Sequence, residues 1–196
     1  MIRWLAVALA TLTLTGCQAE PENWHGKDIQ GLMPDLAFEL KGTNGDTVTP
    51  ADSRGQVRLL YFGFTSCPDV CPATLAKLRR AVNDMPDPLA GDVTILFVSV
   101  DPQRDTPERL ASYAAFFGDR VVGLTAPEPR LRDLTKRYRT TFGYDEPDAE
   151  GNYNVSHSSA VYAFDRSGEA RLLLRPDLTA EQVTEDLIQL ASAAPD

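Results

Sequence analysis

Cysteine and histidine are scarce in this sequence of 196 residues, which holds three cysteines and two histidines. Three cysteines are too few for a small scaffold held together by disulfides, so each one needs its own explanation. Basic residues are also in the minority, because 19 Lys and Arg stand against 28 Asp and Glu, a net charge of −9. An acidic molecule repels phosphate backbones, so nucleic acid is not expected as a partner. The remaining composition, 43% hydrophobic and 24% charged, predicts one globular domain.

The apolar stretch near the N-terminus is short. It covers residues 4–14 after a single charge, Arg3, which suits a signal-peptide core and not a full bilayer span. It ends in Leu14-Thr15-Gly16-Cys17, which resembles the lipobox of bacterial lipoproteins. The resemblance implies a signal peptide over residues 1–16, acylation of Cys17, and export to the periplasm on a lipid anchor, in either the inner or the outer membrane. The alternative is an uncleaved signal anchor with an incidental cysteine.

Residues 17–33 are polar and have no sustained hydrophobic period. Such a segment is typical of a tether that holds a domain away from a lipid surface. One of the two histidines, His25, lies in it, and we expect this side chain to be solvated and not to bind metal. The folded domain is therefore predicted over residues 34–192.

Hydrophobic patterns within that range indicate alternating strands and helices. Continuous apolar runs at 57–64 and 93–100 are typical of parallel strands that helices bury on both faces. Leu75, Leu78 and Val82 recur between them at helical spacing. The further predicted elements are an N-terminal hairpin with a strand at 36–40 and a turn at Asn44-Gly45, a helix from Thr106-Pro107, a strand at 121–124, a helix over 128–142, a strand pair at 159–165 and 169–175, and a helix after the capping box of Thr179 and Gln182.

The order of these elements predicts the fold class. A βαβ start followed by an antiparallel strand pair and a terminal helix is the thioredoxin-like α/β arrangement, extended here by the N-terminal hairpin, in a single domain. Open α/β sheets place their sites at the carboxyl ends of the strands. The segment that directly follows the strand at 57–64 is therefore the first place to look for chemistry.

Two cysteines lie in that segment, in Cys67-Pro68-Asp69-Val70-Cys71-Pro72. Proline fits only the first turn of a helix, so Cys71 should begin the helix and Cys67 should lie just ahead of it. The helix dipole favours thiolates there, whereas burial would oppose them. Three residues separate the cysteines where thioredoxin-type reductants have two, which suits two thiolates that hold a soft ion. Thiolate ligands select Cu(I), zinc or iron–sulfur, and two sulfurs need at least one further ligand.

Only His25 and His157 can supply an imidazole. His157 directly precedes the predicted strand at 159–165, and in the thioredoxin fold that loop lies beside the cysteine loop and normally carries a cis-proline. No proline occurs between Pro147 and Pro176. The fold therefore predicts that His157 takes this place and provides the third ligand.

Three motifs together resemble the Sco/SenC family of copper-binding, thioredoxin-like proteins, over about residues 34–192. They are the cysteine motif at 67–72, Ser-Val-Asp-Pro-Gln-Arg-Asp-Thr-Pro at 99–107, and Tyr-Asn-Val-Ser-His-Ser at 153–158. The resemblance implies one copper, as Cu(I) or Cu(II), held by Cys67, Cys71 and His157. It also implies a role at the binuclear copper site of cytochrome c oxidase, either in copper delivery or in reduction of that site's cysteines.

Asp101 and Ser156, which belong to these motifs, leave alternatives open. Asp101 follows the second central strand and is a candidate contact behind the metal ligands or toward a partner, whereas Asp105 and Thr106 can equally serve as caps of the next helix. The family usually has Asp immediately before the histidine, but Ser156 stands there in this sequence. The change puts the tuning of the site and partner docking in question.

Three functions follow as hypotheses. The first is a metallochaperone, not an enzyme, that carries copper to a cytochrome c oxidase subunit or another cuproprotein. The second is a thiol–disulfide oxidoreductase, which needs Cys67 and Cys71 but not His157. The third is a peroxidase with a single reactive cysteine near Thr65, which needs neither the second cysteine nor His157. An oxidising compartment would also require a partner thiol reductase.

Overall fold

The two continuous apolar runs form the centre of an eight-stranded sheet. A computed structural model describes residues 23–193, and in it β4 (Val57–Gly63) and β5 (Val93–Ser99) pair in parallel and are almost entirely buried. Strand β6 (Val121–Thr125) continues the parallel part beside β5, while β9 (Val161–Phe164) pairs antiparallel with β4. Burial on both faces explains why neither central run alternates polar with apolar residues.

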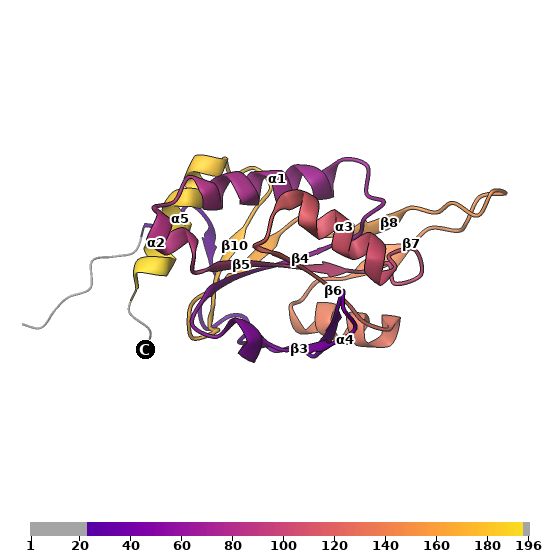
Figure 1. The fold of residues 1–196 in the computed structure, drawn as a ribbon, viewed down its shortest axis with the longest axis horizontal. Coiled ribbons are helices and arrows are strands. Elements are labelled where there is room, and N and C mark those ends of the chain that lie inside the picture. The colour runs from indigo at the N-terminus through magenta and orange to yellow at the C-terminus, as the bar shows by residue number, and fades with distance from the viewer. Residues whose placement is uncertain (1–22, 194–196) are drawn as a thin grey trace, which may run out of the picture.

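Helices cover both faces of this sheet (Figure 1). Helices α1 (Val70–Asn83), α3 (Pro107–Phe117) and α5 (Ala180–Ser192) lie on one face, and α4 (Glu128–Arg137) lies on the other. Helix α3 begins as predicted, since the Thr106 hydroxyl accepts a hydrogen bond from the Arg109 amide and Pro107 takes the first position. The capping box at the start of α5 also forms. The predicted thioredoxin-like α/β fold, in a single domain, is confirmed.

The remaining elements complete the sheet and its connections. The sheet order is β1-β10-β9-β4-β5-β6-β2-β3, and β7 with β8 forms a separate two-stranded sheet. The remaining elements are β1 (Lys27–Asp28), β2 (Leu40–Gly42), β3 (Thr47–Val48), the 3-10 helix Pro50–Ser53, α2 (Asp87–Ala90), β7 (Phe142–Tyr144), β8 (Val155–His157) and β10 (Ala170–Leu174).

The N-terminal hairpin forms, but its first strand lies later than predicted. The turn at Asn44-Gly45 connects β2 to β3, and Gly45 has the positive φ of 84° that such a turn needs. Residues 36–39 are not a strand, although they alternate in polarity. Leu36 is instead buried beside the turn at Gly168, whose carbonyl accepts a hydrogen bond from the Leu36 amide at 2.8 Å.

The helix predicted over 128–142 ends at Arg137. The Tyr138 ring turns into the core, where it is fully buried, and its hydroxyl donates to the Asp35 carbonyl at 3.2 Å. Arg139 then adopts a left-handed conformation with φ of 53°, which stops the helix. The chain continues into β7, which pairs antiparallel with β8. Neither β7 nor β8 was predicted.

The segment expected to be a tether is folded in part. Residues 1–22, including Cys17, lie outside the described residues, but β1 pairs with β10 and Ile29 is buried. The Asp186 carboxylate on α5 accepts hydrogen bonds from the amides of His25 and Gly26 at 2.9 and 2.8 Å. The folded domain therefore begins before residue 34. Between residues 23 and 193, no helix has the length and apolar character needed to cross a membrane.

Candidate metal centre

The cysteine loop connects β4 to α1, at the carboxyl end of the central strand. Cys67 lies in the loop and is half-buried, while Cys71 is in the first turn of α1 and is fully buried. The Cys67 sulfur accepts a hydrogen bond from the Cys71 amide, at 3.3 Å from that nitrogen. Both cysteines are free thiols. The predicted placement of the pair across the start of a helix is confirmed.

A glycine on β4 makes room for the buried sulfur. A Cβ atom at Gly63 would lie 2.8 Å from Cys71 Sγ and 2.7 Å from Cε2 of Phe97. Both distances are below what real Cβ atoms show, so any side chain at this position would displace the sulfur or the ring. The sulfur of Cys71 is thus seated directly on the central strand.

His157 reaches the cysteines from β8, on the separate two-stranded sheet. Its Nδ1 lies 2.9 Å from the Ser158 carbonyl oxygen, and its Nε2 lies 3.4 Å from Cys71 Sγ. A carbonyl only accepts hydrogen bonds, so Nδ1 carries the proton and the lone pair of the neutral ring is on Nε2, toward the sulfur. The Phe64 ring meets the imidazole edge to face, with centroids 5.6 Å apart. The ring is therefore fixed in tautomer and orientation.

The structure brings the three predicted ligand residues together. The sulfurs of Cys67 and Cys71 and the ring nitrogen of His157 all lie within 4.8 Å of one another. Two sulfurs and one imidazole suit a soft or borderline ion such as copper or zinc. Three protein ligands leave one side of such an ion open to an incoming group.

Burial decides the charge of Cys71 in the metal-free protein. It raises the pKa of the Cys71 thiol to about 12, and this outweighs the influence of the nearby Tyr61 hydroxyl, which lowers the pKa. The pKa of Tyr61 itself is also raised, mainly by burial. Burial, one of the two effects expected from the sequence, is therefore the largest influence on the pKa of Cys71. A bound metal has to displace this proton.

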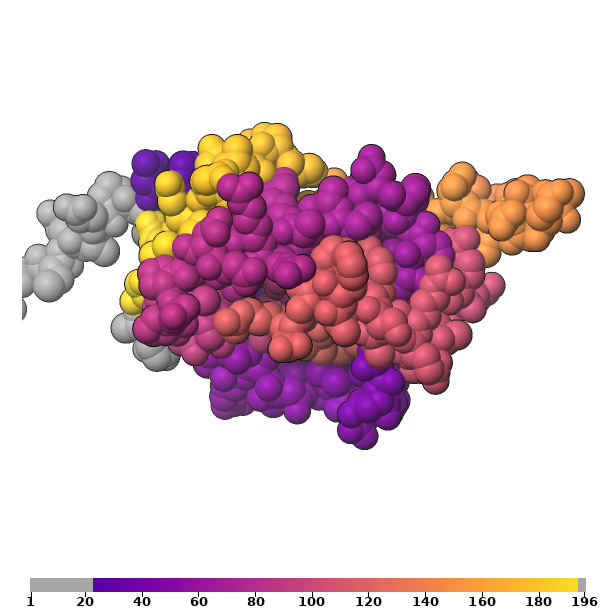
Figure 2. Space-filling model, turned by 45° about the horizontal axis from the view of Figure 1, so that its top comes forward, coloured from indigo at the N-terminus to yellow at the C-terminus, as the bar shows by residue number. Residues whose placement is uncertain are grey.

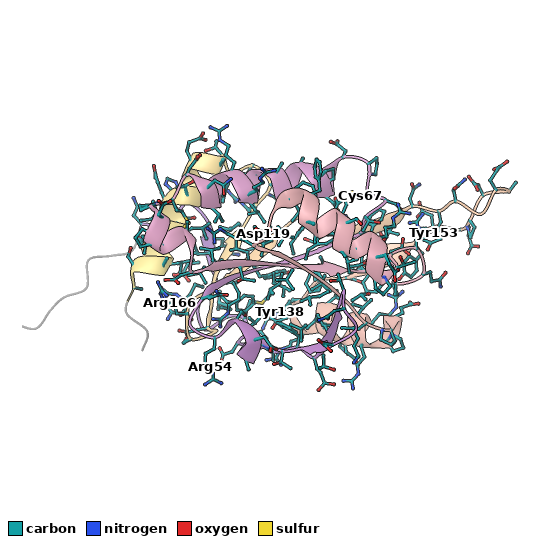
Figure 3. All side chains as sticks on the ribbon, in the orientation of Figure 1. Arg54, Cys67, Asp119, Tyr138, Tyr153 and Arg166 are labelled. Carbon is teal, nitrogen blue, oxygen red and sulfur yellow. The ribbon has the colours of Figure 1, made fainter. Side chains whose placement is uncertain are left out.

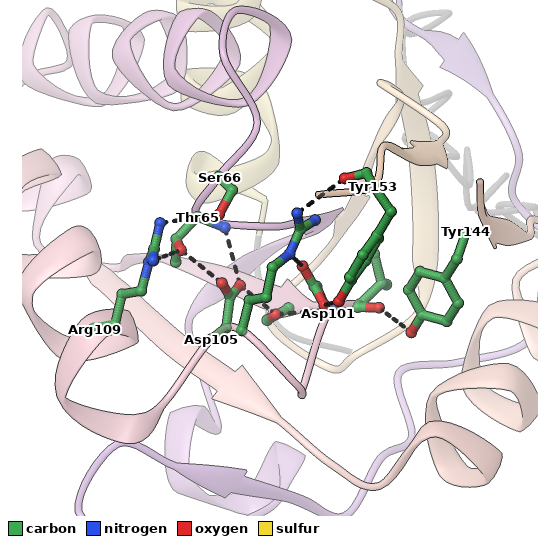
Figure 4. A network of polar contacts seen from close by, with 10 residues as sticks. Thr65, Ser66, Asp101, Asp105, Arg109, Tyr144 and Tyr153 are labelled. Carbon is green, nitrogen blue, oxygen red and sulfur yellow. Dashed lines mark hydrogen bonds and ion pairs between the residues drawn. The ribbon is translucent and has the colours of Figure 1, made fainter. Parts of the chain in front are cut away.

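A buried carboxylate holds the cysteine loop in place (Figure 4). Asp105 accepts hydrogen bonds from the Thr65 amide at 2.9 Å, the Thr65 hydroxyl at 2.6 Å and the Ser99 hydroxyl at 2.5 Å. Arg109 donates to the hydroxyls of Thr65 and Ser66 at 2.6 and 2.9 Å. Of the two proposed caps only Thr106 caps α3, and Asp105 fixes the loop that carries Cys67.

Asp101 is fully buried and lies near the metal centre without belonging to the three-residue group. Its carboxylate accepts hydrogen bonds from Arg104 Nε at 2.5 Å and from the Tyr153 hydroxyl at 2.7 Å. The sequence reasoning missed the roles of Arg104 and Tyr153. Arg104 belongs to the motif at 99–107 and Tyr153 to the motif at 153–158. Their presence in these two motifs was the available signal that both have a role near the site.

Three other residues, His25, Asp69 and Ser156, do not belong to the three-residue group. His25 is held against α5, where its Nε2 lies 2.7 Å from Glu185 Oε2, so it is packed on the domain and is not a linker residue. Asp69, between the two cysteines in the sequence, is exposed. Ser156 is also exposed, and its hydroxyl donates to the Gly143 carbonyl across the two-stranded sheet at 3.3 Å. It therefore does not act on His157 in the way a carboxylate would.

Comparisons with known proteins agree with the geometry. The family model described as SCO1/SenC matches residues 30–192. An SCO2-like protein of Rickettsia typhi is 36% identical over 155 residues, which cover 77% of this chain and 74% of that protein. The human mitochondrial SCO1 homolog is 37% identical over 133 residues, which cover 67% of this chain and 44% of that protein.

Two solved structures similar to this chain contain copper. The copper-bound ScoI of Bradyrhizobium japonicum has a TM-score of 0.71 and 31% identity, and the match covers 80% of this chain and 98% of that one. The copper-bound yeast Sco1 has a TM-score of 0.74 and 28% identity, and the match covers 83% of this chain and 92% of that one. With two cysteines and one histidine converging where the motifs predicted, this chain belongs to the SCO1/SenC family.

Proposed function

We propose that this protein is a copper chaperone that binds one copper ion through Cys67 Sγ, Cys71 Sγ and His157 Nε2. The observation that carries the proposal is the convergence of these three atoms within 4.8 Å, with the imidazole lone pair directed at the sulfur of Cys71. Copper-bound relatives of the same fold support the choice of metal. The ion is cargo, as Cu(I) or Cu(II).

Two features favour transfer of the copper to a recipient: the open side of a three-coordinate ion and the protonation of Cys71 after the copper leaves. Three ligands leave the ion open on one side, so a thiolate of the recipient can bind before any ligand departs. Each later step exchanges one ligand of this protein for one of the recipient. When Cys71 is released, it takes up a proton at neutral pH because burial raises its pKa to about 12. Protonation opposes the return of the copper and so favours delivery.

We propose a cuproprotein as the recipient, with the copper-site subunit of cytochrome c oxidase as the first to test. The experiment loads the domain with Cu(I), mixes it with the metal-free copper domain of that subunit, and follows copper in both by separation and metal analysis. Transfer that requires the cysteines of both proteins supports the proposal. Copper that stays on this protein under reducing conditions contradicts it.

A thiol–disulfide oxidoreductase is the second candidate, because two free thiols lie within 4.8 Å of each other. In this reaction the Cys67 thiolate attacks a substrate disulfide and releases one substrate thiol. Cys71 then attacks the mixed disulfide, which releases the second thiol and leaves a Cys67–Cys71 disulfide that an external thiol reductase must reduce. The raised pKa of Cys71 slows the second attack. The buried thiol therefore favours metal carriage.

Replacement of the two histidines separates these functions. We expect His157→Ala to remove most of the copper affinity and the sulfur-to-Cu(II) absorption band, and to leave reduction of a test disulfide largely intact. His25→Ala is the matched control, since this histidine lies against α5 and should leave copper binding unchanged. Unchanged copper affinity in His157→Ala would show that the three-ligand site is wrong, and disulfide reduction without copper binding would favour the oxidoreductase.

We further propose that Cys17 carries a lipid anchor and that the domain works in the periplasm. The support is the sequence 14–17, which resembles a lipobox. Mass spectrometry of the N-terminal peptide from the full-length protein should show an acylated residue 17. The same peptide from Cys17→Ala should retain residues 1–16, and an unmodified Cys17 in the parent protein would refute the anchor.

A further inference from the structure

The imidazole and the sulfurs of the metal centre come from separate parts of the molecule. Cys67 and Cys71 belong to the body of the domain, at the junction of β4 and α1. His157 lies on β8, which pairs with β7 and not with the main sheet. The chain between β7 and β8 projects from the body, at the end of the molecule where Cys67 and Tyr153 lie (Figures 1, 2 and 3). We call residues 142–157 the arm.

A buried carboxylate of the body, that of Asp101, binds the base of the arm, which is also held by the Tyr144 hydroxyl through its hydrogen bond to the Val100 carbonyl at 2.7 Å. The two oxygens of Asp101 accept hydrogen bonds from opposite sides of the junction, Oδ1 from the Tyr153 hydroxyl at 2.7 Å and Oδ2 from Arg104 Nε at 2.5 Å. Arg104 also donates through Nη1 to the Tyr153 carbonyl at 2.9 Å. Its guanidinium carbon lies 3.8 Å from the centre of the Tyr153 ring. Tyr153 is thus bound through its hydroxyl, its ring and its backbone (Figure 4).

The same contacts reach both sides of the metal centre. The guanidinium of Arg104 lies 5.7 Å from the centre of the Phe64 ring, which packs edge to face on His157. On the body side, the Asp101 amide donates to the Ser99 hydroxyl at 3.1 Å, and this hydroxyl donates to Asp105, which holds the cysteine loop. The hydrogen-bonded chain therefore connects the arm that carries His157 with the loop that carries Cys67.

We propose that Asp101, Arg104 and Tyr153 form a latch that docks the arm on the body and so positions His157 beside Cys71. Asp101 is fully buried, and its carboxylate is satisfied on both oxygens only while the arm is docked. Swinging the arm away would leave this charge without the Tyr153 hydroxyl and Arg104 without its stacking partner, which is costly in a buried site. The latch rests on the proposed function, because it explains how that site is preorganised for copper.

The least disruptive test removes one hydroxyl. Tyr153→Phe keeps the ring against Arg104 and deletes only the hydrogen bond to Asp101. In the metal-free protein, ring-current shifts of the His157 imidazole protons report its packing on Phe64, and we expect them to move toward the values of an unpacked histidine. Copper affinity should fall about tenfold, as is usual when a group that supports a metal ligand is lost.

A double-mutant cycle shows whether the effect acts through the imidazole. In a His157→Ala background, Tyr153→Phe should change copper affinity by less than about twofold, because no ligand remains for the latch to position. Tyr162→Phe is the matched control. It removes another buried tyrosine hydroxyl, which donates to the Tyr138 carbonyl at 2.9 Å in the core, and it should leave both readouts unchanged.

The two readouts keep the latch distinct from the proposed function. If His157→Ala leaves copper affinity unchanged, the three-ligand site is wrong, and the metal-free proton shifts still decide whether the arm is latched. Unchanged shifts in Tyr153→Phe would overturn the latch whatever the copper result. An equal loss of affinity in the presence and absence of His157 would also overturn it, since the effect would then not pass through the imidazole.

Discussion

The seat of the buried sulfur can be tested with a single methyl group, by Gly63→Ala. The backbone accepts alanine, because φ at Gly63 is not positive. The added Cβ, however, would lie 2.8 Å from Cys71 Sγ and 2.7 Å from Phe97 Cε2, where real Cβ atoms stay beyond 3.0 Å. Either the sulfur or the ring must move. Metal–ligand distances vary by only about 0.2 Å, so a displaced sulfur weakens the site.

The expected effects differ for stability and for copper. Overpacking of this kind costs about 1–3 kcal/mol of unfolding free energy. Copper affinity should fall by a further 10- to 100-fold, on the order seen when the surroundings of a metal ligand are disturbed. Thermal or denaturant unfolding of the metal-free protein measures the first effect, and competition with a Cu(I) chelator of known affinity measures the second.

A second glycine provides the matched control. A Cβ at Gly123 on β6 would lie 2.8 Å from Leu110 Cγ, so Gly123→Ala overpacks another strand of the same sheet to a similar degree without meeting a sulfur. We expect this variant to lose stability and to keep its copper affinity. If both variants lose copper affinity equally, or if Gly63→Ala loses none, then direct seating of the sulfur on Gly63 does not control the metal site.

Three further predictions concern stability. Burial raises the pKa of Cys71 from 9.0 to about 12, so its contribution to the stability of the metal-free protein is complete below pH 9 and is lost between pH 9 and about 12. Between these pH values the unfolding free energy of the parent protein should fall by up to about 4 kcal/mol, and that of Cys71→Ala should not show this fall. Parallel curves of unfolding free energy against pH for the two proteins would contradict the buried thiol. Asp105→Ala should lower the unfolding free energy measured by denaturant titration by about 2–4 kcal/mol, because three donors lose their acceptor. The control Asp69→Ala replaces an exposed residue and should change the unfolding free energy by no more than about 0.5 kcal/mol. A fragment that begins at residue 30 should be about 2–4 kcal/mol less stable than one that begins at residue 23, because it loses β1 and buried Ile29. Equal stability of the two fragments would show that residues 23–29 act as a tether and not as part of the folded domain.

The sequence was sufficient for the fold and for the residues of the metal centre because both depend on local patterns. Continuous apolar runs marked β4 and β5, and a proline in the cysteine motif fixed where α1 begins. The carboxyl edge of a parallel sheet then brought the motifs together. The imidazole of His157 was predicted from the topology of the fold and not from its own surroundings.

Long-range contacts account for the rest. Residues 25–29 are polar enough to resemble a tether, and their fixed position comes from distant contacts, among them those with the Asp186 carboxylate and the edge of β10. Helix α4 ends early because the buried Tyr138 side chain finds a hydrogen-bond partner in the Asp35 carbonyl, about a hundred residues away in the sequence. Tyr153 and Thr65, which donate to Asp101 and Asp105, are likewise distant in the sequence, so sequence patterns could place these carboxylates near the site without separating their roles.

The burial of Cys71 keeps its thiol protonated, and this affects disulfide exchange and copper binding differently. A thiol with a raised pKa is a poor nucleophile at neutral pH, which disfavours rapid disulfide exchange, but it does not prevent copper binding, since a soft metal displaces the proton. Cys67 differs because it is half-buried and its sulfur accepts an amide hydrogen bond at the start of the helix. The two sulfurs are therefore unequal: an incoming thiol can approach the more accessible Cys67 first, while Cys71, once the copper has left it, regains its proton. In the proposed copper transfer, that inequality would give the exchange a direction that two equivalent thiolates would lack.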